Sequence, residues 1–95
     1  MSVNVIVQFK ALAASLSAFQ NIMEAVKVDL PKISGCRGVS VMQDLEDPCR
    51  YTLVEVWESQ VRHAAHVESL VADGTWASIA CHLDTQPSTG YFRTL

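Results

Sequence analysis

The stretch YTLVEVWESQVRHAAH, residues 51–66, changes from the period of a strand to the period of a helix. In its first half Leu53 and Trp57 point to one side and Val54 to the other, so both faces of a strand carry apolar side chains that need cover. Ser59 follows, and its side-chain oxygen can accept a hydrogen bond from an unpaired backbone N–H at the start of a helix. The stretch therefore predicts a strand that passes directly into a helix.

The rest of the chain divides by the same two periods. Strands are predicted where apolar and polar residues alternate, and helices where apolar residues recur every three or four positions. The predicted strands are residues 3–9, 37–44, 50–58 and 89–95. The predicted helices are residues 15–29, which Pro31 cannot continue, residues 60–70, and a further segment capped by Thr75 after Asp73-Gly74. Turn residues at 46–48 make a hairpin of the second and third strands.

This order, β-α-β-β-α-β, predicts a ferredoxin-like α+β fold, with a four-stranded antiparallel sheet and the helices on one face. Residues 1–95 are expected to form a single domain. Leu53 and Trp57 point to one side and Val54 and Val56 to the other, so both faces of the sheet need cover. The helices cover only one face, and a second copy of the sheet is the simplest cover for the other. The sequence therefore favours a homodimer in which the two sheets pack against each other. The alternative is a monomer with one face of its sheet exposed to water.

Composition argues against several classes of partner. The net charge is −3 and the seven basic residues are scattered, so neither nucleic acid nor an anionic membrane surface is an expected partner. No apolar run is long enough to cross a membrane, and the first residues do not resemble a secretion signal, so we expect a cytoplasmic protein. The three cysteines, Cys36, Cys49 and Cys81, are dispersed, so we expect reduced and mostly buried thiols.

Several short motifs in this order resemble those of the antibiotic biosynthesis monooxygenase (ABM) family. The resemblance covers nearly all of residues 3–94. The motifs that carry it are Gly35-Cys36 at the start of the second strand, Asp44 to Pro48 in the hairpin, Glu55-x-Trp57-Glu58-Ser59, and Ala65-His66 in the following helix. Each motif is weak alone, and their order and spacing together are specific for the fold.

The resemblance implies a dimeric α+β barrel with a mostly apolar pocket between sheet and helices in each subunit. It also implies a cofactor-independent monooxygenase that oxidises a quinol- or anthrone-like aromatic molecule with O₂. Other members are non-redox isomerases or have no known substrate, because one fold supports many activities. A small-ligand-binding protein, or a dimeric module without chemistry, therefore remains an alternative.

Oxidation without a cofactor needs few groups from the protein. An electron-rich enolate or phenolate can itself give the first electron to O₂, so the protein supplies an apolar cavity, a proton acceptor and donors to an oxyanion. His66 is the predicted catalytic base. The predicted substrate-binding residues are Gln8, Tyr51, Glu55, Trp57, His63 and Trp76, with Asn4 as a further amide. Tyr51 and Tyr91 could donate to an oxyanion, although tyrosines at strand starts commonly reach solvent.

The two histidines of the helix leave alternatives open. His63, His66, Val67 and Leu70 share one helix face, which suits a pocket wall and equally a structural histidine. His63, near the helix start and beside Arg62, favours a solvated position. A contact of Glu55 with His66 would orient a base or simply link strand to helix. A zinc site would need a further ligand at a recognisable spacing, so no metal is expected.

The haem-degrading branch of the family can be tested by position. Its pattern needs an amide side chain on the first strand, a Trp in the second helix and a His ligand further along. With the strand-three Trp aligned and no gaps, its positions fall on Gln8, His66 and Trp76. The amide position is acceptable and the other two do not match, so haem breakdown is disfavoured and no cofactor is expected.

Overall fold

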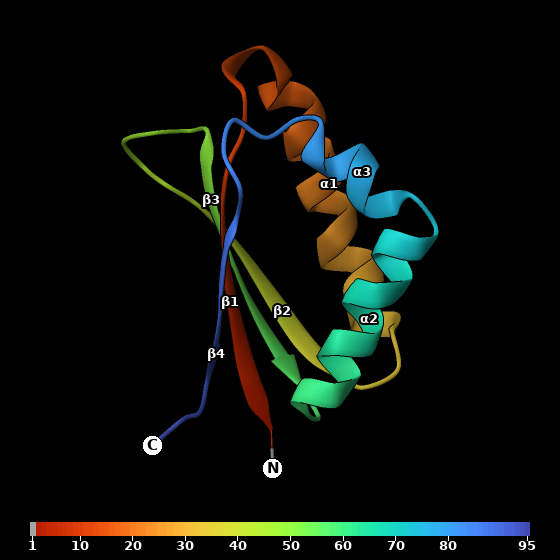
Figure 1. Cartoon of the computed structure of the whole chain (residues 1–95). Coiled ribbons are helices and arrows are strands. Elements are labelled where there is room, and N and C mark those ends of the chain that lie inside the picture. The colour runs from red at the N-terminus through yellow and green to blue at the C-terminus, as the bar shows by residue number, and fades with distance from the viewer. Residues whose placement is uncertain (1) are drawn as a thin grey trace.

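The computed structural model describes residues 2–95 as a sheet with all of its helices on one side (Figure 1). The sheet is antiparallel, has four strands and follows the order β2-β3-β1-β4. The strands are β1 (Val3–Lys10), β2 (Cys36–Gln43), β3 (Arg50–Trp57) and β4 (Ser88–Phe92). The helices are α1 (Leu16–Asp29), α2 (Gln60–Ala72) and α3 (Thr75–Ala80), with short 3-10 turns at Ala13–Ser15 and Leu30–Lys32. The predicted ferredoxin-like α+β fold is confirmed.

The core lies between the inner face of the sheet and α1. Val5, Val7 and Phe9 of β1 are buried there, as the alternation of residues 3–9 predicts. Phe19 from α1 places its ring edge-on against Phe9, with ring centroids 5.5 Å apart, and is fully buried. Trp57 of β3 is also fully buried and anchors the other end of the layer, beneath α2.

The start of α2 is fixed from two directions. Ser59 Oγ accepts a hydrogen bond from the Arg62 backbone N–H at 3.2 Å, so the predicted N-cap is confirmed. Gly35 has a φ of +92° and no side chain, and a Cβ at this position would lie only 2.9 Å from Arg62 Cβ. Its carbonyl accepts a hydrogen bond from the Glu58 N–H at 2.7 Å. Only glycine allows this approach, which holds the first turn of α2 close to the start of β2.

The C-terminal third differs in detail from the sequence predictions. The N-cap of α3 is Gly74, in the left-handed conformation with φ of +84°, and not Thr75. Asp73 Oδ1 accepts a hydrogen bond from the Thr75 N–H at 2.9 Å, so an aspartate preceding the glycine supplies the cap's oxygen. β4 ends at Phe92, before the predicted residue 95, because the ladder with β1 extends only from Ser88 to Phe92. None of the helices in residues 2–95 has the length and apolarity to cross a bilayer.

The three cysteines are free thiols, but their burial was overestimated. Cys36 and Cys49 are half-buried and Cys81 is exposed. Cys81 caps the C-terminal end of α3, where its Sγ donates to the Ser78 carbonyl at 3.1 Å rather than facing the core. The prediction of mostly buried thiols is therefore wrong for Cys81.

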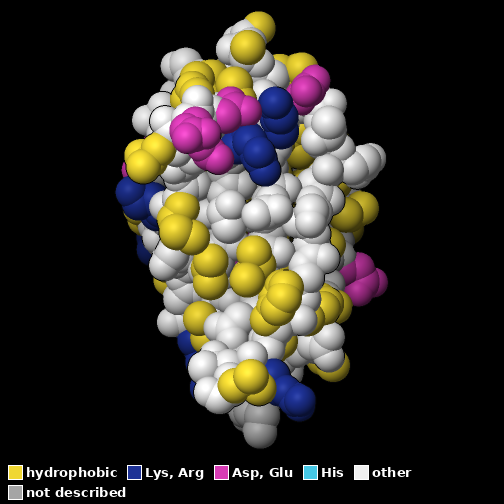
Figure 2. Space-filling model, turned by 90° about the vertical axis from the view of Figure 1, so that its left-hand side faces the viewer, with side chains coloured by type: hydrophobic (Ala, Val, Ile, Leu, Met, Phe, Trp, Pro, Cys, Tyr) yellow, Lys and Arg dark blue, Asp and Glu magenta, His cyan; other side chains and the backbone are white. Residues whose placement is uncertain are grey.

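The face of the sheet that the helices leave open carries an apolar patch (Figure 2). The strand registers place Ile6 of β1 beside Val54 of β3, so both lie on this face, opposite the core. The patch consists of Ile6, Met42, Val54, Val56 and Phe92, all half-buried or exposed. In this view most charged side chains gather near the upper end and a few lie at the edges and at the lower end, so the middle of the face carries hydrophobic and uncharged groups.

Candidate functional site

A cavity of about 470 Å³ lies between the inner face of the sheet and the three helices. Its wall is mostly aliphatic and aromatic, with Phe9, Met23 and Leu53 from the core at its base and Trp76 from α3 at its side. Val67 and Val71 of α2 contribute at the rim, where both are exposed, so the cavity reaches the surface. The polar side chains in the wall are Glu55, His63, His66, Thr89 and Tyr91. This is an apolar pocket with a small convergent polar group, the usual form of a small-molecule site.

Three of these polar side chains, Glu55, His63 and Tyr91, contact one another in a row above the sheet. Glu55 of β3 and Tyr91 of β4 are both register partners of Val5 in β1, so they flank it on the same rung and face the helices. His63 of α2 lies above Val5 and reaches both. Its Nδ1 is 2.7 Å from the Tyr91 hydroxyl, and its Nε2 is 3.8 Å from Glu55 Oε1.

Glu55 is a buried carboxyl group with one close donor. The Trp57 indole Nε1 donates a hydrogen bond to Glu55 Oε1 at 2.8 Å. Burial raises the pKa of Glu55, because a charged carboxylate is disfavoured away from water, and the Trp57 hydrogen bond offsets part of that rise. Burial therefore favours the protonated form of Glu55, and the hydrogen bond from Trp57 favours the ionised form.

His63 is buried, with a relative exposure of 5%, so the prediction of a solvated position is wrong. Gly35 and Ser59 hold the first turn of α2 against the sheet, and the residue one turn into the helix then faces inward. Burial lowers the pKa of His63, and the nearby His66 lowers it further. His63 is therefore neutral at physiological pH.

His66 lies one turn further along α2, on the same helix face. Its ring lies over the Trp57 indole, with ring centroids 5.1 Å apart and planes tilted by 31°. Burial lowers the pKa of His66 as well, so its imidazole is also neutral near pH 7. The side chain that approaches Glu55 is His63, so the predicted contact of Glu55 with His66 is not formed.

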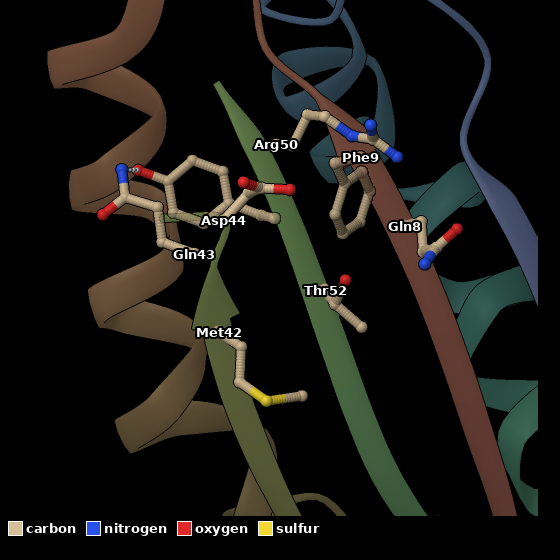
Figure 3. Close-up of a pocket in the computed structure, with 8 residues that line it drawn as sticks. Gln8, Phe9, Met42, Gln43, Asp44, Arg50 and Thr52 are labelled. Atoms are coloured by element: carbon tan, nitrogen blue, oxygen red, sulfur yellow. Dashed lines mark hydrogen bonds between the residues drawn. The ribbon is translucent and has the colours of Figure 1, made fainter. Parts of the chain in front are cut away.

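The remaining candidates lie in different places. Trp76 lines the pocket, whereas Trp57 is buried beneath the two histidine rings. Gln8 and Tyr51 line a separate hollow of about 200 Å³ near the hairpin (Figure 3). There the Tyr51 hydroxyl accepts a hydrogen bond from Gln43 Nε2 at 3.1 Å, the dashed line in the picture. Asn4 is bonded to Thr94 Oγ1 at 3.0 Å.

The structure adds Tyr91 to the pocket wall. The residue is 41% exposed, in line with the expectation that it reaches solvent, while its hydroxyl contacts His63 Nδ1 at 2.7 Å. Alternation places Thr89 and Tyr91 on the same face of the last strand, and only the pairing of Tyr91 with Val5 shows that this face is the inner one. Within residues 2–95 no three His, Cys, Asp or Glu side chains are grouped so that they could hold a metal ion.

Several solved structures share this fold over nearly the whole length of the chain. A conserved protein from Methanosarcina mazei is 20% identical, with a TM-score of 0.85 and coverage of 100% of this chain and 94% of its own. A Mycobacterium tuberculosis protein is 19% identical, with a TM-score of 0.84 and coverages of 100% and 96%. A Nitrosomonas europaea protein, provisionally described as an antibiotic biosynthesis monooxygenase, is 18% identical, with a TM-score of 0.86 and coverages of 99% and 90%. At these identities the likeness establishes the fold alone.

The family is established from the sequence itself. None of the curated proteins matches the chain. The family model for antibiotic biosynthesis monooxygenases matches residues 2–73, which include β1 to β3, α1 and α2, and hence Glu55, His63 and His66. The chain therefore belongs to the antibiotic biosynthesis monooxygenase family.

Proposed function

We propose that this protein is a cofactor-independent monooxygenase that oxidises a quinol- or anthrone-like aromatic molecule with O₂. The observation that carries the proposal is an apolar pocket whose wall holds two imidazoles, His63 and His66, both with lowered pKa. Its volume of about 470 Å³ is in the range of roughly 300–1,000 Å³ that is usual for small-molecule sites. A flat aromatic substrate gains most from such apolar walls.

The proposed reaction converts a ring methylene into a ketone. A base removes a proton from the reacting carbon, and the electron-rich anion gives an electron to O₂. The two radicals combine into a peroxide, and loss of water from the peroxide leaves the ketone. One oxygen atom enters the product, the other leaves as water, and the substrate supplies all four electrons. The apolar wall keeps water away from the reactive anion.

His66 is the proposed acceptor of the proton from the reacting carbon. Its neutral ring lines the pocket and lies on the Trp57 indole, which fixes the plane of the imidazole. Burial lowers the pKa of His66, so the imidazole is neutral near pH 7 and its free ring nitrogen can accept a proton. Trp76, on the pocket wall, is proposed to pack against the substrate's ring system.

The test is O₂ uptake with an anthrone in buffer treated to remove metals. His66→Gln is expected to lower the rate by about 10²–10⁴-fold, the usual contribution of a general base. His82→Gln is the matched control, because His82 does not line the pocket. An unchanged rate in His66→Gln would remove His66 from the mechanism.

The same pocket would also suit a non-redox isomerase, since a neutral base in an apolar wall can move a proton without O₂. The two activities separate in the same assay under nitrogen. Turnover that continues without O₂ would replace the oxygenase proposal with the isomerase. Uptake of one O₂ for each ketone formed is the result we expect.

We also propose that two copies pair through the open face of the sheet. The support is the apolar patch of Ile6, Met42, Val54, Val56 and Phe92, which leaves apolar side chains in water on an isolated chain. A second copy of the same patch would bury both at once, because an isologous interface is self-complementary.

A further inference from the structure

The side-chain network Glu55–His63–Tyr91 is not used by the proposed chemistry of His66. We propose that Tyr91 is the residue that accepts the proton of a substrate hydroxyl group, and that His63, held by Glu55, takes the proton onward from Tyr91. Tyr91 is then a catalytic residue, and His63 and Glu55 are positioning residues. The inference rests on the proposed function, because it assigns a second proton-transfer point in the same pocket.

The geometry orders the three groups from the buried interior to the pocket. Glu55 and His63 are buried, with exposures of 7% and 5%, whereas Tyr91 is 41% exposed. The Tyr91 hydroxyl is thus the end of the network that a bound molecule can reach, and the 2.7 Å contact joins it to His63 Nδ1. The ring of His63 also lies edge-on to the tyrosine ring, with centroids 5.3 Å apart.

The direction of the hydrogen bond between His63 and Tyr91 follows from the carboxyl oxygen that lies 3.8 Å from the other ring nitrogen of His63. Glu55 Oε1 already accepts from Trp57 Nε1, and it is the oxygen nearest to His63 Nε2. This arrangement favours the His63 tautomer with its proton on Nε2, facing the carboxyl group. Nδ1 is then an acceptor and takes the hydrogen bond from the Tyr91 O–H. The lone pairs of the Tyr91 oxygen remain available for a substrate donor.

The proton transfer balances without any further reactant. The substrate O–H bond breaks as its proton moves to the Tyr91 oxygen, and the Tyr91 O–H bond breaks as that proton moves to His63 Nδ1. The products are a substrate phenolate and an imidazolium whose Nε2–H faces Glu55. The phenolate oxygen donates electron density to the ring, so the anion that forms at the reacting carbon is a stronger electron donor to O₂.

The surroundings of His63 decide whether it can hold that proton. The titratable groups that face it are Glu55 from β3, Tyr91 from β4 and His66 from its own helix. Cys36 of β2 is close enough to Glu55 for the carboxylate to contribute to the raised pKa of the thiol, after burial as the main cause. His66 opposes a charge on His63 and Glu55 favours it. Glu55→Gln replaces the carboxyl oxygen that faces the imidazolium Nε2–H with a weaker acceptor, so it is expected to weaken the relay.

The test uses 4-nitrophenol, whose anion is coloured and which has a hydroxyl proton but no reacting carbon. The apparent pKa of the bound probe is read from its absorbance across a pH series. Tyr91→Phe and His63→Gln are each expected to make ionisation of the bound probe about tenfold less favourable, as expected when a hydrogen-bonded base is lost. Glu55→Gln is expected to shift the pKa in the same direction by less.

The matched control is Tyr51→Phe, which also removes one phenol hydroxyl but from the separate hollow near the hairpin. It should leave the pKa of the bound probe unchanged. Circular dichroism of each variant establishes that it folds, and the ¹⁵N shifts of the His63 ring give its tautomer without any ligand. An Nδ1-protonated ring in the wild-type protein would contradict the proposed direction of transfer.

The outcomes separate the relay from the proposed function. If the probe binds and its pKa is the same in Tyr91→Phe as in the wild type, the relay is wrong and the oxygenase proposal stands. A larger shift in His66→Gln than in Tyr91→Phe would assign the hydroxyl proton to His66 and also overturn the relay. If the wild-type protein shows no saturable binding of the phenol, the relay is wrong, whereas the oxygenase proposal is decided separately by O₂ uptake with the anthrone.

Discussion

Glu55 holds a buried carboxyl group against a tryptophan and a histidine. Its pKa is raised by burial, so the folded protein holds the Glu55 proton at pH values where the unfolded chain has lost it. The opposite holds for His63 and His66, whose pKa values are lowered by burial. The unfolded chain binds protons at these histidines below about pH 6.5 while the folded protein resists them. Acid therefore destabilises the fold through the histidines, and rising pH destabilises it through Glu55.

Glu55→Gln is expected to change stability in a pH-dependent way. The wild type loses stability as pH rises from the unfolded pKa of Glu, about 4.3, through the raised folded value, and the glutamine variant lacks this loss. The variant should thus gain stability relative to the wild type between pH 4 and pH 7. Urea unfolding at both pH values measures the difference. A relative loss at pH 7 would show that Glu55 is a charged partner of His63 in the resting protein.

At the scale of elements, the tight passage from β3 into α2 decides where the pocket histidines point. Gly35 and Ser59 fix the start of α2 against the start of β2, and this sets the rotation of the helix about its axis. His63 then faces the rung that carries Glu55 and Tyr91. A shift of α2 by a fraction of an ångström would lengthen the 2.7 Å contact to Tyr91.

Gly35→Ala tests this passage, with Gly74→Ala as its matched control. Both glycines have positive φ, but only at Gly35 would a Cβ meet another atom, Arg62 Cβ at 2.9 Å. We expect Gly74→Ala to cost about 1–2 kcal/mol, from backbone strain alone. Gly35→Ala should cost about 1–3 kcal/mol more, the usual range for overpacking. Equal losses in urea unfolding would mean that the contact with Arg62 relaxes freely.

At the scale of the whole molecule, the two faces of the sheet differ in what covers them. The inner face is covered by helices and holds the pocket, while the outer face exposes aliphatic and aromatic side chains such as Met42 and Phe92, which are 49% and 51% exposed (Figures 1 and 2). The apolar fraction of the sequence, 49%, fits a chain that covers part of its surface with a partner.

Val54→Glu is expected to convert the proposed dimer into a folded monomer. Val54 is central in the patch, so a pair of copies would bury two like charges close together at this point. Val61→Glu is the control, because Val61 lies on α2 with 77% exposure and outside the patch. Sedimentation velocity measures the mass of each variant. A monomeric wild type, or a dimer that persists in Val54→Glu, would contradict pairing through this face.

The local periods in the sequence were sufficient for most of the fold. The strands at residues 3–9, 37–44 and 50–58 and the helix at 15–29 agree with the structure to within a residue or two, because alternation and helical spacing are set by neighbours along the chain. The Ser59 cap was likewise readable, since it needs only residues within one helical turn. The Thr75 cap was misplaced because the left-handed Gly74 ends one helix and begins the next.

The sequence by itself determined the order of the elements, the apolar face of each strand and the family of the chain. Only the tertiary structure decided which side chains meet in the pocket. The strand order β2-β3-β1-β4 brings Glu55 and Tyr91, far apart in the chain, to either side of Val5. The rotation of α2 then buries His63 between them and separates Gln8 and Tyr51 into another hollow. Contacts of this kind depend on packing between distant segments, which no local period encodes.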